Sequence, residues 1–454
     1  MDVSVRRDAR VHIVGVGGAG MSGVARLLVE RGARVSGSDA QDSSAVEGLR
    51  ALGVDVYVGH DAHHGADADV VLWSPAIATD NPELAAARAR GALMMNRAAL
   101  FGELATEQRV LGLTGTHGKT TATSMLVQVL FASGRDDGRL LGVEVLGVGA
   151  NGHFGSDDLV VELDESYGTF AEVAPYALGL LNVEPDHLDH YGSLDALEEA
   201  FAALVERTSG PVVVWSDDGG ARRVAERAQR EVIDVGTADD ATWHIGDVTV
   251  RRDSSSFTLR GPGVDILLTL QVSGAHNVAD AAVVAVLAIS LGISLDDVAT
   301  GLARFEGAPR RFQLLGTWRD VDVYESYAHL PGEITAIVNA THAAGYERIL
   351  AVFQPHRVTR TLNLVHEFAA AFDGVSTVIV TDIYRAGEEN PTGVTGEVIE
   401  RAIGERGAGV RHVYCARLDD VPGVLEDLRS DHDVVVLLGA GDVASIAPRL
   451  RGVT

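Results

Sequence analysis

The residues best suited to chemistry stand in a glycine-containing loop between an apolar run and a helix-like run. Residues 115–121 read Gly-Thr-His-Gly-Lys-Thr-Thr. Glycines let a backbone approach phosphate groups, while loop N–H groups and a helix N-terminus present partial positive charge to them. Lys119 is expected to reach the terminal phosphates and Thr120 to bind Mg²⁺. The spacing is shorter than the eight-residue Walker A signature, and a plain strand-to-helix turn is the alternative.

We therefore predict that this loop binds a nucleotide. The nucleotide-binding residues predicted from it are Gly115, Thr116, His117, Gly118, Lys119, Thr120 and Thr121.

A second glycine-rich loop follows the first apolar run of the chain. Residues 11–14 are apolar, residues 15–20 read Gly-Val-Gly-Gly-Ala-Gly, and a helix-like segment comes next. A further strand, 35–38, ends at Asp39. This strand–helix–strand pattern predicts a Rossmann-like unit that binds a phosphate-bearing ligand. Glycines that serve only helix–strand packing are the alternative.

Acidic side chains follow two later strands. Residues 162–166 read Glu-Leu-Asp-Glu-Ser at the end of one apolar strand, and residues 186–190 read Asp-His-Leu-Asp-His after another. Mg²⁺ prefers oxygen ligands and keeps several waters, so carboxylates with one imidazole suit it. We expect these acids to lie beside the phosphate loop, with a solvated acidic loop as the alternative.

Three further segments offer groups for a nucleotide or an acidic substrate. His276 and Asn277 open a long apolar helix, where side chains can hydrogen-bond an adenine edge unless Asn277 only caps the helix. Arg310 and Arg311 stand at a domain junction, where a guanidinium can clamp a phosphate or carboxylate. Residues 354–361, Gln-Pro-His-Arg-Val-Thr-Arg-Thr, follow a strand and place two arginines three apart. They predict capture of a carboxylate or phosphate, with a charged surface helix as the alternative.

Composition limits the class of protein. A chain of 454 residues is expected to hold two to four domains, and 46% apolar with 22% charged residues is typical of soluble globular proteins. The net charge of −27 disfavours nucleic acid and anionic membranes as partners. The single cysteine, Cys415, excludes internal disulfides and cysteine-based zinc sites. No apolar run approaches about 18 residues and no signal peptide opens the chain, which predicts a cytoplasmic protein without membrane insertion.

Strand-like and helix-like runs alternate along the chain and restart at Arg109 and after Phe312. Such alternation predicts parallel sheets, whereas residues 247–270 alternate like an antiparallel ribbon. We expect an α/β fold of three domains. These are a Rossmann-like N-terminal domain (1–107), a central P-loop domain with a parallel sheet (108–309) and a C-terminal Rossmann-like α/β domain (310–454).

Taken together, the motifs resemble those of the Mur ligases over essentially the whole chain. The segments that carry the resemblance are 15–23, 115–121, 162–166, 186–191, 276–277, 310–312 and 353–357. The resemblance implies an N-terminal domain for a UDP-N-acetylmuramate-type sugar, a central ATPase domain and a C-terminal domain that helps to bind an amino acid. It also implies that ATP phosphorylates the substrate carboxylate. An amine then attacks the acyl phosphate to give an amide, ADP and phosphate.

The resemblance also implies roles for individual residues. UDP-sugar binding is expected of Gly17, Gly18, Ser22, Asp39, His60 and Ser74. Mg²⁺ is expected on Thr120, Glu162 and His187. ATP is expected to contact His276, Asn277, Arg311 and Glu325 besides the loop. Catalytic roles are expected of Lys119, His187, His329, Arg357 and Arg360. The partners are then small molecules, the UDP-sugar and the amino acid, and the chain is expected to be a monomer or homodimer.

The chain departs from the family pattern near the acceptor and nucleotide sites. Leu330 replaces a histidine, Asp280 replaces the second asparagine of His-Asn-x-x-Asn, and Glu325 replaces another acid. The Leu330 replacement predicts an altered or broadened choice of amine. Alternatives to the main interpretation are a specialised paralogue with a different acceptor or acyl substrate, a recycling ligase that attaches a preformed peptide, and a catalytically weak nucleotide-sugar-binding protein.

Overall fold

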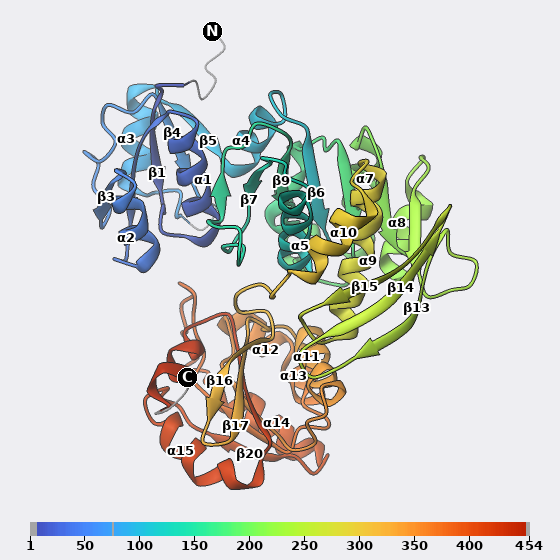
Figure 1. Ribbon diagram of the computed structural model, residues 1–454. Coiled ribbons are helices and arrows are strands. Elements are labelled where there is room, and N and C mark those ends of the chain that lie inside the picture. Colours follow the sequence, from blue (N-terminus) through green and yellow to red (C-terminus); the bar gives the residue numbers. More distant parts are fainter. Residues whose placement is uncertain (1–6, 75–76, 451–454) are drawn as a thin grey trace. The chain divides into compact units, whose positions relative to one another are not determined.

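Three sheets follow one another along the chain in the computed structural model, which describes residues 7–74 and 77–450 (Figure 1). Helices alternate with the strands, so the predicted α/β fold is confirmed. Contacts divide the chain into two compact units. One holds the residues up to Thr249, Ser256–Gln271 and Asn277–Glu306, and the other holds Val250–Ser255, Val272–His276 and the residues from Gly307 onward. The first unit contains the first two sheets except for Val250 and Ser255, which are end residues of two strands of the second sheet. The predicted boundaries after residues 107 and 309 stay predictions.

The first sheet is parallel, with strand order β3-β2-β1-β4-β5. Its strands are β1 (Arg10–Val14), β2 (Arg34–Asp39), β3 (Asp55–Val58), β4 (Val70–Trp73) and β5 (Leu93–Asn96), and the helices of this region are α1 (Ala19–Glu30), α2 (Ser44–Ala51), α3 (Pro82–Arg90) and α4 (Arg97–Leu104). The strand order reverses between β1 and β4. Open α/β sheets bind ligands at such a switch point, outside the carboxyl ends of the strands. The glycine loop after β1 and Ser74 after β4 stand there.

The second sheet has the order β15-β14-β13-β12-β11-β10-β6-β9-β7-β8. Its strands are β6 (Val110–Thr114), β7 (Gly138–Leu140), β8 (Gly152–His153), β9 (Leu159–Glu162), β10 (Ala177–Leu180), β11 (Val212–Trp215), β12 (Ile233–Gly236), β13 (Trp243–Val250), β14 (Ser255–Gly261) and β15 (Val264–Leu270). Strand β6 pairs in parallel with β10 on one side and β9 on the other. The loops after these three strands therefore meet at one edge. Connections of only a few residues join β13, β14 and β15, which is possible only where neighbouring strands run antiparallel.

The helical segments between and after these strands are α5 (Lys119–Ala132), η1 (Ser166–Glu172), α6 (Leu188–Tyr191), α7 (Leu194–Arg207), α8 (Gly219–Arg227), α9 (Ala275–Ser290) and α10 (Leu295–Ala303). Helix α5 begins at the phosphate loop and is buried from Thr120 to Leu130. A helix buried all round lacks an amphipathic stripe, because every face meets protein.

The third sheet has the order β16-β17-β21-β18-β19-β20. Its strands are β16 (Gln313–Trp318), β17 (Val321–Ser326), β18 (Ile349–Phe353), β19 (Thr377–Val380), β20 (Arg411–Tyr414) and β21 (Val434–Leu438), and its helical segments are α11 (Pro331–Ala343), α12 (Val358–Asn363), α13 (Val365–Ala371), α14 (Glu397–Arg406), α15 (Val421–Leu428), η2 (Arg429–Asp431) and η3 (Val443–Arg449). Only β16 pairs antiparallel with its neighbour. Two buried apolar clusters include residues from this sheet.

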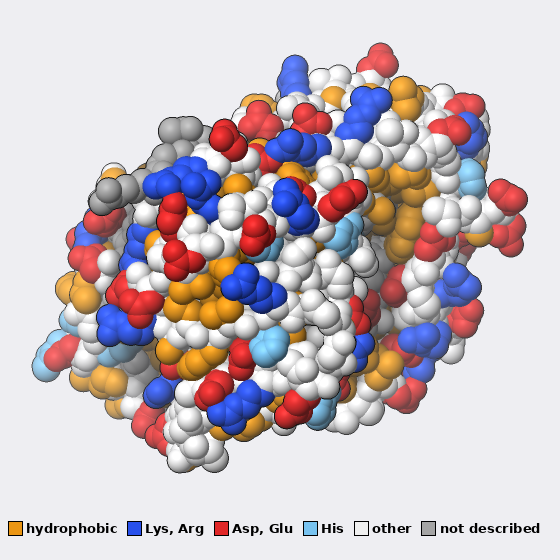
Figure 2. All heavy atoms as spheres, turned by 90° about the horizontal axis from the view of Figure 1, so that it is seen from below, with side chains coloured by type: hydrophobic (Ala, Val, Ile, Leu, Met, Phe, Trp, Pro, Cys, Tyr) orange, Lys and Arg blue, Asp and Glu red, His pale blue; other side chains and the backbone are white. Residues whose placement is uncertain are grey.

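Charged side chains of both signs are interspersed on the face drawn in Figure 2, so the net charge of −27 is not gathered into one patch there. Phosphate groups of a ligand must therefore be met by local donors. Within residues 7–74 and 77–450, none of the helices combines the length and the apolar character needed to cross a bilayer.

Helix α5 is placed by a close contact with α10. A Cβ added to Gly301 of α10 would lie 2.4 Å from the Cα of Val129 in α5. Backbone atoms cannot yield to such a contact as a flexible side chain can. The glycine therefore allows the two helices to pack closely.

We predict that Gly301→Ala lowers the midpoint of thermal unfolding. Overpacking is expected to destabilise by about 1–3 kcal/mol, which exceeds the gain of about 1 kcal/mol from the better helix propensity of alanine. Gly423→Ala in α15 is the matched control, because its added Cβ meets open space. Calorimetry on both variants checks the prediction, which is wrong if the two variants unfold at the same temperature.

Candidate functional site

The phosphate loop joins the buried strand β6 to α5 with two glycines in left-handed or extended positive-φ conformations. Gly115 has φ +144°, and its Cβ would lie 3.0 Å from the backbone of Asn182. Gly118 has φ +82°, and its Cβ would lie 2.6 Å from a carboxylate oxygen of Asp280. Other residues are strained at positive φ, and here the added atom would also collide. The glycine spacing read from the sequence is therefore required by the fold.

Asn182, just beyond β10, holds the outer part of this loop. Its side-chain oxygen accepts a hydrogen bond from the N–H of His117 at 2.7 Å, and its amide donates to the carbonyl of His117 at 3.0 Å. Its backbone carbonyl accepts from the N–H of Thr116 at 3.1 Å. Three hydrogen bonds with one residue thus hold Thr116 and His117 of the loop.

Lys119 is the only lysine of the chain, and its ammonium group is buried within the loop. It donates to the carbonyls of Gly115 (2.7 Å) and Thr116 (3.1 Å) and to the carboxylate of Glu165 (2.7 Å). Burial alone would lower the pKa of Lys119, but the nearby carboxylates of Glu165 and Asp164 raise it above its usual range. The group is therefore a fixed positive charge at the point where phosphates are expected.

The two acids beside Lys119 respond differently to their surroundings. Burial raises the pKa of Glu165 to about 7, against the opposing attraction of Lys119. The pKa of Asp164 lies below its usual value, because Lys119 and hydrogen bonds from Ser166 outweigh the effect of burial. Lys119 thus keeps Asp164 ionised, whereas the pKa of Glu165 lies near neutral pH.

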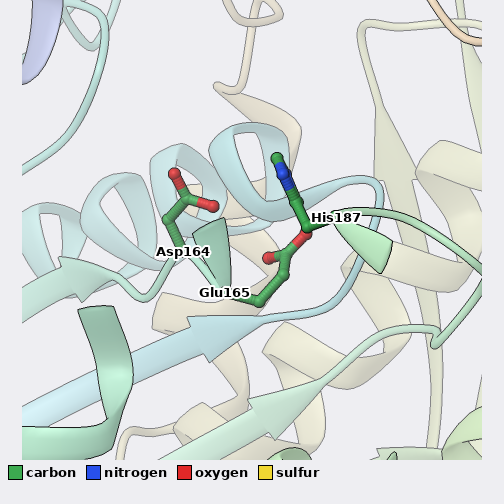
Figure 3. A group of neighbouring side chains, drawn as sticks. All are labelled: Asp164, Glu165 and His187. Atoms are coloured by element: carbon green, nitrogen blue, oxygen red, sulfur yellow. The ribbon is translucent and has the colours of Figure 1, made fainter. Parts of the chain in front are cut away.

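The predicted magnesium ligands fall into two neighbouring groups. The Thr120 hydroxyl donates to Glu162 at 3.0 Å, so these two predicted ligands lie together. The third, His187, lies with Asp164 and Glu165, and one ligand atom from each of these three residues lies within 4.8 Å of the others. Figure 3 shows Asp164 and Glu165 on one segment and His187 on another. His187 has φ +51°, a conformation uncommon outside glycine.

In the C-terminal domain, His329 and His356 stand after β17 and β18, with ring centroids 5.6 Å apart. The Nδ1 of His329 lies 3.0 Å from the carbonyl of Tyr327. A carbonyl can only accept, so Nδ1 carries the proton and Nε2 keeps a lone pair in the neutral ring. Burial lowers the pKa of His329, partly opposed by Glu333 and reinforced by Arg360. His329 is therefore neutral at neutral pH.

The predicted arginines lie close to these histidines. Arg360 donates toward His356 Nδ1 at 3.5 Å, and burial, His329 and the arginines lower the pKa of His356 to about 3. Arg357 adopts φ +71° directly before α12. The structure thus brings together His329, Arg357 and Arg360 of the predicted catalytic residues. A cavity of about 410 Å³ lies nearby, lined in part by Tyr384, whose ring stacks on His356.

Two predicted ATP contacts, Glu325 and Arg311, also lie in the C-terminal domain. The Glu325 carboxylate is buried and accepts a hydrogen bond from Arg310 at 2.6 Å. The guanidinium carbons of Arg310 and Arg311 lie 4.9 and 5.3 Å from the centroid of the Tyr327 ring. Two more predicted contacts, His276 and Asn277, lie in the first turn of α9. Burial lowers the pKa of His276 to about 4, which keeps it neutral.

The predicted UDP-sugar residues gather at the carboxyl edge of the first sheet. Asp39 accepts hydrogen bonds from the N–H groups of Gly17 and Gln41, so this acid organises the glycine loop. Gly18 stands directly before α1, and the Ser22 hydroxyl donates to the carbonyl of Ala19. The other two residues, His60 and Ser74, follow β3 and β4. The roles of all six predicted UDP-sugar residues stay predictions.

Comparison with known proteins covers the whole chain. Residues 10–109 match the domain described as "Mur ligase family, catalytic domain", residues 113–288 the "Mur ligase middle domain" and residues 310–441 the "Mur ligase, glutamate ligase domain". The UDP-N-acetylmuramate--L-alanine ligase of Thermobifida fusca is 42% identical over 99% of this chain and 97% of its own. The chain belongs to the Mur ligase family. It is therefore an ATP-dependent ligase, as the loop around Lys119 indicates.

Two further relatives agree with this membership. The enzyme of the same name from Clavibacter sepedonicus is 40% identical over 98% of this chain and 93% of its own. The crystal structure of UDP-N-acetylmuramate-alanine ligase MurC from Thermotoga maritima superposes with a TM-score of 0.83 at 29% identity, over 97% of this chain and 98% of that one. A murein peptide ligase from Psychrobacter arcticus, at 23% identity and TM-score 0.74, shares the fold.

Some residues that shape the Mur ligase site were not predicted. Asn182 follows an apolar strand as an ordinary polar residue, and only the sheet order places it against the phosphate loop. Glu165 stands inside a recognised motif, but its pairing with Lys119 depends on packing. An asparagine at the end of a parallel strand next to a glycine loop is the sequence signal that could have indicated the role of Asn182 in holding that loop.

We predict that Glu165 titrates with a midpoint near pH 7 in the unliganded protein. Because Lys119 is the only lysine, ¹⁵N-lysine labelling yields one Nζ resonance, which is expected to shift with that midpoint. The pKa of Glu165 is raised on folding. The group therefore contributes stability below about pH 4, its unfolded pKa, and this contribution is lost as the pH rises through about 7.

Glu165→Gln is expected to abolish this titration of the Lys119 resonance. Glu184→Gln is the control, because Glu184 also lies at the loop, near His117, but is about half exposed. A midpoint that persists in Glu165→Gln would show that another group titrates.

Proposed function

We propose that this Mur ligase joins the carboxylate of UDP-N-acetylmuramate to the amino group of L-alanine, with release of ADP and phosphate. The observation that carries the proposal is the buried Lys119 in an intact phosphate loop, in a chain that matches ligases of this name along nearly its full length. Such a loop supports phosphoryl transfer rather than nucleotide-sugar binding alone, which speaks against a catalytically weak binding protein.

Mg²⁺ is the cofactor proposed beside ATP, and the residues present fit it. Oxygen ligands are available from Thr120 and Glu162, and the Asp164, Glu165 and His187 ligand atoms converge within 4.8 Å. Hard cations of this kind favour carboxylate and hydroxyl oxygens. When bound, the ion neutralises charge on the transferred phosphoryl group.

Lys119 has the central role in the first step. Its ammonium is expected to exchange the carbonyls of Gly115 and Thr116 for phosphate oxygens, since phosphates are stronger acceptors. The substrate carboxylate oxygen forms a bond to the γ-phosphorus of ATP while the bond from phosphorus to the bridging oxygen breaks, giving ADP and an acyl phosphate. The buried positive charge of Lys119 stabilises the negative charge that spreads over the phosphoryl oxygens.

His329 is proposed to act in the second step as the group that receives a proton from the amine. Its Nδ1–H is held by the Tyr327 carbonyl, which leaves the Nε2 lone pair as the basic site. The amine nitrogen forms the amide bond to the acyl carbon, and the carbon–oxygen bond to phosphate breaks. Arg357 and Arg360 are proposed to stabilise the departing phosphate. Both are always charged and suited to phosphate oxygens.

Acceptor choice is proposed to follow the named relatives. Leu330, which departs from the family pattern, stands directly before α11, where its N–H donates to Glu333 at 3.1 Å. The same Glu333 oxygen accepts from the N–H of His329 at 2.8 Å. This capping arrangement uses backbone groups, so it tolerates different side chains at position 330. Because the named relatives are L-alanine ligases, we propose alanine as the preferred acceptor, and the broadened choice expected from Leu330 stays a prediction.

The test of the proposal is ATP turnover with UDP-N-acetylmuramate and a panel containing alanine, glycine, serine, larger amino acids and a murein tripeptide. ADP release is expected only when both the sugar carboxylate and an amine are present, since the phosphoryl group otherwise lacks its acceptor. The specificity constant kcat/KM should be highest for alanine. Preference for the tripeptide would establish the recycling ligase, and rapid hydrolysis without substrates would establish a simple ATPase.

We predict that Lys119→Ala lowers ADP release by about 100-fold or more, because a charge that stabilises the transferred phosphoryl group is removed. UDP binding should stay within about twofold, since the residues proposed to bind it lie in the first sheet. Calorimetric titration with UDP and a coupled ADP assay measure the two effects. Arg401→Ala, which removes an exposed cation of α14, is the control. Normal turnover of Lys119→Ala would disprove this assignment of the active site.

A further inference from the structure

A buried carboxylate lies inside the N-terminal domain, away from the phosphate loop. Glu83 is the second residue of α3, and its side chain is 1% exposed. The Asn81 side chain caps the helix by accepting the N–H of Glu83 at 2.9 Å. An isolated buried charge is unfavourable by several kcal/mol, so such a group is retained only where hydrogen bonds satisfy it.

Three side chains from different parts of the sheet supply those hydrogen bonds. One oxygen of Glu83 is bonded to His12 Nε2 at 2.7 Å and to the Ser38 hydroxyl at 2.8 Å. The other is bonded to His60 Nδ1 at 2.8 Å. Burial alone would raise the pKa of Glu83, but the bonds from His12, Ser38 and His60 keep it below its usual value. Glu83 is therefore a carboxylate at neutral pH.

This carboxylate determines which nitrogen of His60 carries the proton. A carboxylate can only accept, so the Nδ1 of His60 is protonated. The Ser38 hydroxyl has already donated its hydrogen to Glu83, so at 3.3 Å from His60 Nδ1 it can only accept as well. In the neutral ring, Nε2 then keeps a lone pair. The His60 side chain is 22% exposed, which leaves this ring open to solvent.

His60 also lies near the predicted UDP-sugar loop. The backbone N–H of Gly59, the residue before it, donates to the Asp39 carbonyl at 2.8 Å. The Asp39 carboxylate in turn accepts the N–H of Gly17 at 2.9 Å. His60 and the glycine loop are thus linked through Gly59 and Asp39 at the carboxyl edge of the sheet.

We propose that Glu83 is a positioning residue for nucleoside recognition. It locks His60 in the tautomer whose Nε2 accepts a hydrogen bond from an N–H or O–H of the bound uridine, either the uracil imide or a ribose hydroxyl. The inference rests on the proposed function, which places the UDP-sugar in this domain. Glu83 does not itself touch the ligand. Its effect is on the orientation and protonation of His60.

The first test is Glu83→Gln, which preserves shape and removes the charge. The dissociation constant of UDP, measured by calorimetry, is expected to rise about tenfold, because one ligand hydrogen bond is weakened. The KM for the UDP-sugar should rise in parallel, while kcat and the KM for ATP stay within about twofold. Glu47→Gln is the matched control, being an exposed acid in the first turn of α2. Unchanged UDP affinity in Glu83→Gln overturns the proposal.

The second test reads the tautomer directly. Side-chain ¹H–¹⁵N spectra of histidine-labelled protein are expected to show His60 protonated at Nδ1 in the wild type and at Nε2, or at both in exchange, in Glu83→Gln. A merely structural role of Glu83 would leave the tautomer unchanged. Should Glu83→Gln fail to fold, His60→Phe retains Glu83 and a ring of similar size. It is expected to show the same tenfold weaker UDP binding, and normal binding overturns the proposal.

The ligand donor is identified with UDP analogues. Either 3-methyluridine diphosphate or 2′-deoxyuridine diphosphate is expected to bind wild type about tenfold more weakly than UDP, and that difference should vanish in Glu83→Gln. If neither analogue loses affinity, the proposed acceptor role of His60 is wrong. A wild-type protein that binds no UDP would instead refute the proposed function, so the two failures are distinguishable.

Discussion

The site depends on the socket that holds the Lys119 ammonium. The chain contains 37 lysine and arginine residues, and every one except Lys119 is an arginine. An ammonium group has three N–H donors, and the socket offers three acceptors, two loop carbonyls and the Glu165 carboxylate. A planar guanidinium presents five donors in a fixed fork and cannot be satisfied by this arrangement. The geometry of the socket therefore explains why position 119 is a lysine and not an arginine.

The socket exists because three parallel strands end at one edge. Strand β6 leads into the loop, β9 delivers Glu162 and the two acids beyond it, and β10 delivers Asn182. The close approach of Asn182 accounts for Gly115 of the loop. Gly118 is accounted for by the buried acid Asp280 of α9, which lies against it where the family pattern has an amide. The acid thus lies at the loop without altering the glycine spacing that phosphate binding requires.

Most of the fold and part of the site were predictable from the sequence. Apolar runs such as β6 and β18 are buried along their whole length, and the glycine loops after β1 and β6 require no distant partner to be recognised. By contrast, neither β3, which is almost entirely exposed, nor β20, which is only partly buried, was predicted from the sequence. Glu83 follows Asn81 and Pro82, which indicates only a helix start. Its pairing with His12 and His60 arises from contacts between residues 23 to 71 positions apart.

Glu83 and Glu165 are both buried carboxylates, yet burial leads to opposite outcomes. Glu83 accepts three well-directed hydrogen bonds and faces no acid among its partners, so it stays ionised and holds its neighbours still. Glu165 shares one ammonium with Asp164 and titrates near neutral pH. A carboxylate in the first setting suits a region that must recognise a ligand with fixed donors and acceptors. A carboxylate such as Glu165 can gain or lose its proton when new charges arrive. This suits a region where phosphate and metal charges enter and leave in each reaction cycle.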